Sequence, residues 1–527
     1  MNEDRSANDQ RTVADDVHTL HRMGYTQELA RCLNGFSNFA ISLSIICILA
    51  GGLTSFSLGF CSVGGAAIGL GWPAMCLLSL AVAATMGQIA SAFPTAGGLY
   101  HWAAILGGRG WGWGTAWFNL AGLVTALAAI NVGTFRFAGA VFFPNSADNY
   151  VLQFLVVAAI TCSQAVINHL GIRVTRVLTD FSGWWILSVS IALTVALLAF
   201  APALEFGRLI TFTNYSGFPI GAEKPVWPPT SSLVWLFALG LLLPAYTITG
   251  FDASAHASEE TVGASINVPR GIVRSVFVSG VFGWVMLCAI VLAMPDPTAA
   301  AQQGERAFIH TLLAVVPAWL ASPLLWGAVI AQYLCGLATV TSASRMAFAF
   351  ARDGGLPASR WVRWVSPKFH APPVAIWSVS LAALLFTIST PVYSTITVVC
   401  VIFLYVSYVV PTAIGVLAYG RSWNKFGPWQ LGRWFRPLGV LSVVGCIALI
   451  IIGMQPPNGQ AAYVVGGMTI GLTALWFARV RHTFAGPPHG VIRMRQHAAN
   501  EVAETAAHES TPPEFNVGDG RVRQIRL

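Results

Sequence analysis

The sequence predicts an all-α integral membrane protein with about 12 transmembrane helices, and three observations support this fold class. Hydrophobic residues make up 55% of the 527 residues and charged residues only 9%, with a mean hydropathy of +0.65, a balance typical of membrane proteins. Apolar segments of about 20 residues, each long enough to cross a bilayer, recur along almost the whole chain. Tryptophan is frequent, with 19 residues, as expected for side chains at membrane interfaces.

The expected transmembrane segments follow one another as 36–60, 71–93, 113–140, 151–169, 181–200, 233–257, 272–294, 319–350, 374–390, 392–418, 438–454 and 461–480. The first 30 residues carry several charges and no apolar signal-peptide core, so we expect no cleavable signal peptide. Residues 1–33 and 482–527 are expected to be soluble and largely disordered cytoplasmic tails, the second because it is polar and contains prolines.

Basic residues predict the orientation. If the N-terminus is cytoplasmic, the outer loops hold only Arg208, Lys224 and Arg306, and the other loop arginines and lysines lie inside. The formal net charge of +8 then faces anionic cytoplasmic lipid and does not indicate a nucleic-acid partner. We expect a multi-pass protein of the plasma membrane with both termini in the cytoplasm.

The sequence lacks the patterns of an enzyme. Its nine cysteines lie mostly in apolar segments, and no pair has metal-ligand or redox spacing. It has no glycine-rich phosphate loop, nucleophile elbow or zinc signature. His101, His169 and His256 are interpreted as interfacial or packing residues. We therefore expect no catalytic residue, no metal and no cofactor apart from a coupling ion, H⁺ or Na⁺.

Two expected spans are interrupted near their middles. The first holds the pair Gly51-Gly52 followed by Thr54, where a continuous helix would favour Leu or Ala. The sixth holds Gly250 and Asp252. A carboxylate at membrane depth is costly unless it faces a protein cavity, so Asp252 indicates a binding or proton site. Close helix packing is the alternative interpretation of the glycine pair.

The two interruptions lie five spans apart, which predicts an inverted repeat. Because five is odd, a second five-span unit enters the membrane from the opposite side, so 34–202 and 233–418 are expected to be inverted repeats, with 419–481 outside them. Opened backbone N–H groups attract a substrate carboxylate, whereas freed carbonyls and Asp252 attract a cation or an ammonium group. An amino acid or a cationic amine fits such a site.

Several motifs, taken in chain order, resemble one known family. They are Leu20 to Leu29, Phe93 to Trp102, Trp111 to Trp113 with Trp117 to Asn119, Tyr246 to His256, Ser258 to Thr261, Thr341 to Met346, and Ala351 to Pro357. Over residues 20–480 the chain resembles the amino acid/choline transporter family of the amino acid-polyamine-organocation (APC) superfamily. The resemblance implies a LeuT-like fold, a 5+5 inverted repeat followed by two further helices.

The resemblance also implies the binding residues. The residues expected to bind substrate are Ala50, Gly51, Gly52, Leu53 and Thr54 in the first break, and Thr249, Gly250, Phe251 and Asp252 in the second. The first group would hold a carboxylate, Phe251 would be an aromatic lid, and Asp252 would pair with the substrate amine or carry a proton. The alternatives are ordinary packing for Phe251 and helix capping for Asp252.

The coupling-ion candidates are Asp252, Thr341, Ser342 and Ser344. In LeuT-like sodium symporters, hydroxyls of the eighth span join first-span carbonyls around sodium. Serine and threonine also commonly bond to their own helix, which is the alternative. The fifth span carries no lysine to replace a sodium ion. Asp252 could carry a proton instead, and an exchanger without a coupling ion remains open.

Two further features at the expected cytoplasmic end are interpreted as scaffold. Glu259 and Glu260 are expected to pair with nearby arginines, and Arg345, Arg352 and Asp353 form a similar cluster after the eighth span. Pro269, following Asn267, is expected just inside the start of the seventh span.

These observations predict a secondary active permease for amino acids or related amines, working by alternating access around the two breaks. Choline, gamma-aminobutyrate and polyamines satisfy the same bipolar site, and an exchanger has the same fold. A nutrient receptor or a channel is the alternative outside transport. The expected partners are a small amine or amino acid and the lipid bilayer.

Overall fold

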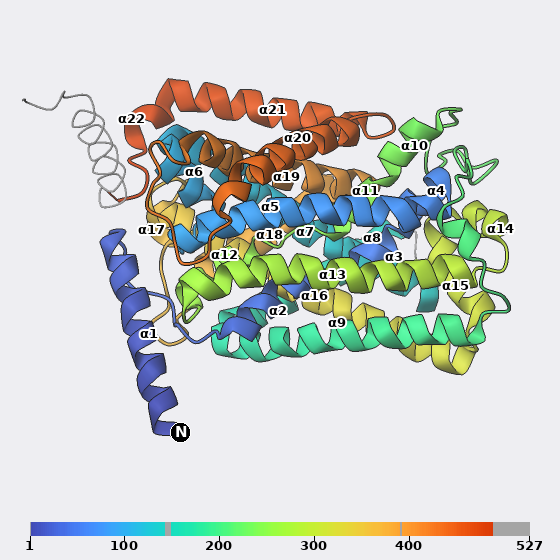
Figure 1. The fold of residues 1–527 in the computed structure, drawn as a ribbon, viewed down its shortest axis with the longest axis horizontal. Helices are drawn as coiled ribbons and strands as arrows, with labels where there is room; N and C mark the ends of the chain where they lie inside the picture. Colours follow the sequence, from blue (N-terminus) through green and yellow to red (C-terminus); the bar gives the residue numbers. More distant parts are fainter. Residues whose placement is uncertain (1, 143–148, 390–392, 489–527) are drawn as a thin grey trace, which may run out of the picture.

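The computed structural model describes residues 2–142, 149–389 and 393–488 (Figure 1). Throughout these residues the chain is helical, and no strand forms apart from two isolated bridges. Residues 489–527, most of the tail for which disorder is expected, lie outside the described part of the chain.

Helices of the first half have the following bounds: α1 (Asn2–Arg22), α2 (Gly35–Ile45), α3 (Gly51–Thr54), α4 (Phe56–Val63), η1 (Ala67–Gly71), α5 (Trp72–Ala92), α6 (Leu99–Gly107), α7 (Arg109–Phe142), α8 (Tyr150–His169), α9 (Ile172–Phe200) and η3 (Phe206–Leu209).

Helices of the second half follow as α10 (Leu233–Gly240), α11 (Leu242–Thr247), α12 (Ala253–His256), η4 (Ser258–Glu260), α13 (Ala264–Ala293), α14 (Pro297–Gln302), η5 (Gly304–Arg306), α15 (Ala307–Val315), α16 (Ala318–Arg352), α17 (Ser359–Val362), α18 (Pro373–Ser389), α19 (Tyr393–Ala418), η6 (Gly432–Trp434), α20 (Phe435–Gly453), α21 (Gly459–Leu475), η7 (Trp476–Val480) and α22 (Arg481–Thr483).

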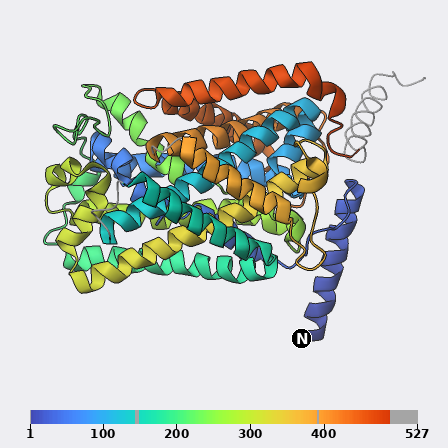
Figure 2. The ribbon, with the colours of Figure 1, turned by 180° about the vertical axis from the view of Figure 1, so that it is seen from behind.

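The described residues contain nine helices long and apolar enough to cross a membrane, so the chain is a multi-pass helical membrane protein. Three shorter apolar helices, Gly35–Ile45, Leu233–Thr247 and Pro373–Ile388, lie where the first, sixth and ninth spans are predicted. The long helices run side by side in one bundle (Figures 1 and 2). In the span Arg109–Gly139, 89% of the apolar 18-residue core is buried, so this helix lies inside the bundle; in Gly459–Thr483 only 11% is buried, so this helix lies at the edge.

The N-terminal tail differs from the sequence prediction, because α1 is a helix of 21 residues. It extends away from the bundle at the end that also carries α6, α17 and α22 (Figure 1). Its last turn is attached through the buried side chain of Leu20, and Met23 just beyond is buried too. Asp16 lies 3.4 Å from Arg31 in an ion pair. Tertiary contacts therefore order a segment whose composition is typical of disorder.

The start of the seventh span also differs from the prediction. Helix α13 begins at Ala264, so Pro269 lies inside it. Proline has no N–H to donate to the carbonyl four residues back, which is that of Ser265. The Ser91 hydroxyl donates to this carbonyl at 2.7 Å instead. The N-terminus of the helix is capped from a distance, because the Asp16 carboxylate accepts from the N–H of Gly263 at 2.7 Å and of Ala264 at 3.2 Å.

Candidate functional site

The first interruption lies slightly earlier than predicted. Helix α2 ends at Ile45 and residues 46–50 are not helical, so of the predicted residues only Ala50 is in the break. Gly51, Gly52, Leu53 and Thr54 form the single turn α3. The glycine pair is therefore not what opens the helix.

Gly51 has a different role, close approach of two backbones. A Cβ atom at Gly51 would lie 2.9 Å from the Cα of Thr247, at the end of α11, so only glycine fits there. The same atom at Gly52 would meet nothing nearer than 3.7 Å. The packing interpretation of the glycine pair thus holds for Gly51.

The second interruption is where the sequence predicts it. Helix α11 ends at Thr247 and α12 begins at Ala253. Gly250 has φ +84°, a conformation that other L-residues rarely adopt. A Cβ atom here would lie 2.3 Å from Cγ2 of Ile45, the last residue of α2. Glycine is required at this position for both reasons, and the two breaks lie against each other.

The breaks leave backbone groups unpaired. In the described part of the chain, the N–H groups of Gly52 and Leu53 and the carbonyls of Ile248 and Thr249 form no backbone hydrogen bond. Unpaired N–H groups attract an anion, and unpaired carbonyls attract a cation or an ammonium group. The two breaks thus provide opposite partial charges close together.

A cavity of about 30 Å³ lies between the two breaks. The predicted residues that line it are Ala50, Gly51, Thr249 and Gly250. The lining residues that sequence reasoning missed are Ile45, Ile46, Leu123, Ala126, Ile130, Tyr246, Thr247, Cys335, Cys400 and Leu404. The predicted residues Gly52, Leu53, Thr54, Phe251 and Asp252 are not among the lining residues. This volume has room for only a few water molecules, so an amino acid binds here only if the surrounding helices separate.

Asp252 is fully buried and hydrogen-bonded to three side chains. Its carboxylate accepts from the Tyr408 hydroxyl at 2.8 Å and from the Asn119 amide at 2.9 Å, and Nε2 of His256 lies 3.2 Å away. It makes no side-chain capping bond to α12, so the capping interpretation is wrong. His256, interpreted from the sequence as a packing residue, is instead a partner of this carboxylate.

Tyr408 connects α19 to the second break. Its hydroxyl accepts from the N–H of Gly250 at 3.0 Å and donates to Asp252. The ring of Phe251 packs on the Tyr408 ring, with centroids 5.0 Å apart. The side chain of Phe251 is 1% exposed and packs here, beside the cavity.

Hydrogen bonds of the Ser42, Asn38 and Ser254 side chains join helix α2 to helix α12 and to Phe251, which lies just before α12. The Ser42 hydroxyl donates to the Phe251 carbonyl at 2.9 Å and lies 2.7 Å from the Ser254 hydroxyl. The Asn38 amide donates to the Ser254 carbonyl at 2.9 Å, and the Ser254 hydroxyl donates to the Asn38 carbonyl at 3.0 Å. The half of the first broken helix formed by α2 and the half of the second formed by α12 are therefore held together.

The hydroxyls proposed for a coupling ion are mostly engaged. Thr341 donates to the Asn168 amide oxygen at 2.7 Å, and Ser344 donates to the Thr341 carbonyl at 2.9 Å. Ser342 is buried, and its hydroxyl has no partner among the described residues. Two other side chains of α16 meet the first break: the Cys335 thiol donates to the Ile45 carbonyl at 3.3 Å, and the Gln332 amide donates to the Leu49 carbonyl at 3.3 Å.

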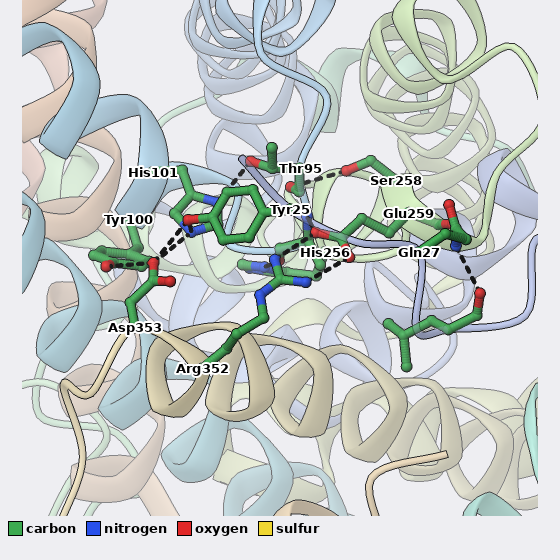
Figure 3. A network of polar contacts seen from close by, with 12 residues as sticks. Tyr25, Gln27, Thr95, Tyr100, His101, His256, Ser258, Glu259, Arg352 and Asp353 are labelled. Carbon is green, nitrogen blue, oxygen red and sulfur yellow. Dashed lines mark hydrogen bonds and ion pairs between the residues drawn. The ribbon is translucent and has the colours of Figure 1, made fainter. Parts of the chain in front are cut away.

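The Glu pair forms the ion pairs that the sequence predicts. Glu259 binds Arg352 through two hydrogen bonds of 2.7 and 2.9 Å, and Glu260 binds Arg345 through two of 3.1 Å. Figure 3 shows Glu259 and Arg352 in the network at this end of the bundle. The Arg345 and Glu260 side chains are both fully buried. These pairs link α16 to the segment after α12.

Asp353 is the centre of the second part of this network (Figure 3). Its Oδ2 accepts from the hydroxyls of Tyr25 and Tyr100, both at 2.8 Å, and lies 3.1 Å from Nε2 of His101. Burial by itself raises the pKa of the Asp353 carboxyl, but the hydrogen bond and charge of His101, with Arg352, bring that pKa below its ordinary value. His101 is thus a bonded residue and not a simple packing residue.

The segment before α2 is bound across the same end. The Arg352 guanidinium lies 4.0 Å above the Tyr25 ring. The N–H groups of Cys32 and Leu33 donate to the Glu260 carbonyl at 2.9 and 2.8 Å. Burial and the charge of Asp353 raise the pKa of Tyr25 well above its usual value, so its hydroxyl stays a donor. The chain segment 23–33 therefore covers this end of the bundle.

The fold and this site define a polytopic helical membrane protein in which two interrupted helices enclose a central cavity. Residues 33–477 match the family model described as amino acid permease, so the chain belongs to the amino acid permease family of the APC superfamily. It is a transporter and not an enzyme.

Individual relatives agree with this assignment. The chain is 29% identical to the amino-acid permease BAT1 of Arabidopsis thaliana, over 90% of this chain and 96% of the relative. It is 30% identical to the BAT1 homolog of Oryza sativa subsp. japonica, over 89% and 94%. It is also 29% identical to an uncharacterized amino-acid permease, C1039.01, of Schizosaccharomyces pombe, over 90% and 85%.

Proposed function

We propose that this protein is a secondary active permease for amino acids without net charge. It works by alternating access around the two breaks, in a LeuT-like 5+5 inverted repeat with two further helices, 12 in all. The positive-inside distribution of arginine and lysine supports a plasma-membrane location with both termini in the cytoplasm.

The cavity lining carries this proposal. None of the residues that line the cavity has a charged side chain, while unpaired N–H groups and unpaired carbonyls flank it on the two breaks. A zwitterion brings one charge of each sign and needs no side-chain counter-ion when backbone dipoles of both signs are present. A substrate with an additional charge would bury that charge without a partner, at a large cost.

Asp252 argues against choline or a polyamine as the main substrate. A cationic amine would need a carboxylate in the cavity, but both oxygens of Asp252 accept hydrogen bonds from Tyr408 and Asn119, and His256 lies beside them. The Asp252 side chain also does not line the cavity. The relatives in plants carry the name amino-acid permease, which favours the same substrate class.

We propose a proton as the coupling ion. The hydroxyls of Thr341 and Ser344 are engaged with protein groups. Asp252 and His256, by contrast, form a buried titratable pair whose atoms are 3.2 Å apart next to the second break. Protonation of the Asp252 carboxylate would weaken the hydrogen bonds that it accepts and that hold the break, which couples proton binding to helix movement.

Uptake of radiolabelled alanine or leucine into proteoliposomes tests the proposal. We expect saturable accumulation that an inward proton gradient drives and sodium does not. Unlabelled neutral amino acids should compete, whereas choline, putrescine and arginine should not. Stronger competition by choline or putrescine would overturn the substrate class. Wild-type pH dependence in Asp252→Asn would overturn the proton role of the pair.

A further inference from the structure

A second cavity lies far from the breaks, on the edge of the bundle. It is a groove of about 410 Å³ between α7, α19 and the C-terminal helix α21 with η7, and we call it the edge groove. Its lining residues are Gly110, Trp111, Trp113, Gly114, Thr115, Phe118, Val406, Val410, Thr469, Leu472, Thr473, Trp476 and Phe477. Figure 1 shows α21 along the outside of the bundle, where a membrane protein meets lipid.

The edge groove is lined mostly by apolar side chains, and its threonine hydroxyls make their hydrogen bonds within their own helices. The three threonines that line it all donate to carbonyls of their own helices: Thr115 at 2.8 Å, and Thr469 and Thr473 at 2.7 Å. Gly114 has no atom within 4 Å of the position that a Cβ would take, so the groove is open beside it. Such a surface suits a hydrocarbon chain and offers little to a polar solute.

Three arginines gather at one end of the edge groove. Arg109 directly precedes the lining residue Gly110, and Arg479 and Arg481 come shortly after Phe477, the last lining residue of η7. The Arg481 guanidinium lies 5.9 Å from the Phe477 ring centroid. Arg109 donates to the carbonyls of Phe484 and Arg481 at 3.1 and 3.0 Å, which holds the end of the C-terminal helix beside the start of α7.

Within the described residues, no acidic side chain pairs with this positive charge. No ion pair formed by the described residues involves any of the three arginines. Arg479 and Arg481 are exposed, and they lie at the end of the bundle where the sequence predicts the cytoplasmic surface. Arg481 Nε donates to Nε2 of His482 at 2.9 Å, which leaves its charge without an acidic partner. An apolar groove at membrane depth, with arginines in no ion pair at its predicted cytoplasmic end, matches an anionic phospholipid in both of its parts.

We propose that the edge groove binds one acyl chain of an anionic phospholipid, and that Arg479 and Arg481 bind its headgroup phosphate. Guanidinium groups bind phosphate through paired hydrogen bonds, and their stems pack on the apolar groove. The lipid would press against α7, the helix whose residues Leu123, Ala126 and Ile130 line the central cavity. Bound lipid would therefore affect transport as well as stability.

Lipid binding to the purified full-length protein in detergent tests the proposal, with phosphatidylglycerol and phosphatidylcholine as probes in native mass spectrometry. We expect preference for phosphatidylglycerol, weakened at least about tenfold in Arg479→Gln/Arg481→Gln. The matched control Arg360→Gln/Arg363→Gln removes the same charge from exposed positions at α17, and it should bind like the wild type. Gly114→Leu, which fills the groove and keeps all arginines, should also weaken binding.

Four results would overturn the proposal. An equal loss of phosphatidylglycerol binding in the two double arginine variants would show that only the net charge matters. Full binding by Gly114→Leu would exclude the acyl site. Displacement of the lipid by inorganic phosphate alone would assign the arginines to a free anion. A dimer that is lost in Arg479→Gln/Arg481→Gln without any change in lipid binding would assign this surface to a second copy of the chain.

Discussion

Replacement of Tyr408 by phenylalanine tests the second break most directly. The Tyr408 hydroxyl accepts from the N–H of Gly250 and donates to the carboxylate of Asp252, and all three residues are buried. Phenylalanine keeps the ring that packs on Phe251. The substitution thus removes one oxygen atom with its hydrogen bonds to Gly250 and Asp252 and a longer one of 3.4 Å to the Thr249 hydroxyl, with almost no change in shape.

The expected loss of stability follows from the buried polar groups that Tyr408→Phe leaves without a partner. A buried donor or acceptor without a partner costs about 1–3 kcal/mol, and more when it is charged. Tyr408→Phe leaves the N–H of Gly250 without its bond and removes one of the donors to Asp252. Two such groups amount to about 2–6 kcal/mol in the free energy of unfolding, and we expect the lower part of this range because Asn119 and His256 remain beside Asp252.

Thermal unfolding in detergent and alanine uptake in proteoliposomes measure the effect. Tyr405→Phe is the matched control, because Tyr405 is also a buried tyrosine of α19 but donates only a long bond of 3.4 Å, to the Ala245 carbonyl. Tyr408→Phe should lower both the melting temperature and the uptake rate far more than Tyr405→Phe. If the two variants behaved alike, the hydroxyl of Tyr408 would not support the break, and this account of the site would be refuted.

Three further predictions concern the breaks and the ionic network around Arg345 and Asp353. Gly51→Ala should reduce uptake about tenfold or more, since its Cβ would lie 2.9 Å from facing backbone, whereas Gly52→Ala should transport like the wild type. Arg345→Met should destabilise the protein by about 3–5 kcal/mol because it leaves Glu260 buried without its partner, and the double variant with Glu260→Leu should recover much of the loss in thermal unfolding. The pKa of Asp353 is lower in the folded protein than the 3.8 of an unfolded chain, so its contribution to stability is present above about pH 4 and lost as the pH falls below. Asp353→Asn should remove that part of the pH dependence of the melting temperature.

The sequence was sufficient for the helical membrane class and for the second break. Hydropathy follows directly from composition, and each predicted span contains a helix in the described residues. Gly250 was identifiable because a glycine next to an acid in an apolar span indicates an irregular backbone. The ion pairs of Glu259 and Glu260 were also predicted, since buried carboxylates need arginines.

The partners of Asp252 could not be found in the same way. Asn119 lies 133 residues away in sequence and Tyr408 lies 156 away, on α7 and α19, and only the packing of these helices brings them together. A lone tyrosine hydroxyl in an apolar span is a weak signal, because it can also reach a membrane interface. The sequence therefore indicated an acid that needs partners, without identifying them.

The offset of the first break has a similar cause. A glycine pair can indicate either an opened backbone or a close helix contact, and the sequence alone does not distinguish these two interpretations. Which of the two applies to Gly51 depends on Thr247, which lies on a helix about 196 residues later in the chain. Similarly, the start of α13 depends on Asp16 and Ser91, whose bonds cross between distant segments.

The hydrogen bonds between α2 and α12 have a mechanical consequence. Asn38 and Ser254 each donate to the carbonyl of the other, and Ser42 donates to the Phe251 carbonyl. Because of these bonds, a rotation of α2 would be transmitted to α12. We expect α2 and α12 to move together as one rigid unit. The chain would bend at the two non-helical stretches, residues 46–50 and 248–252. Movement of α2 and α12 as one unit would also require the chain segment 23–33, whose Cys32 and Leu33 are bonded to the Glu260 carbonyl just after α12, to move or detach.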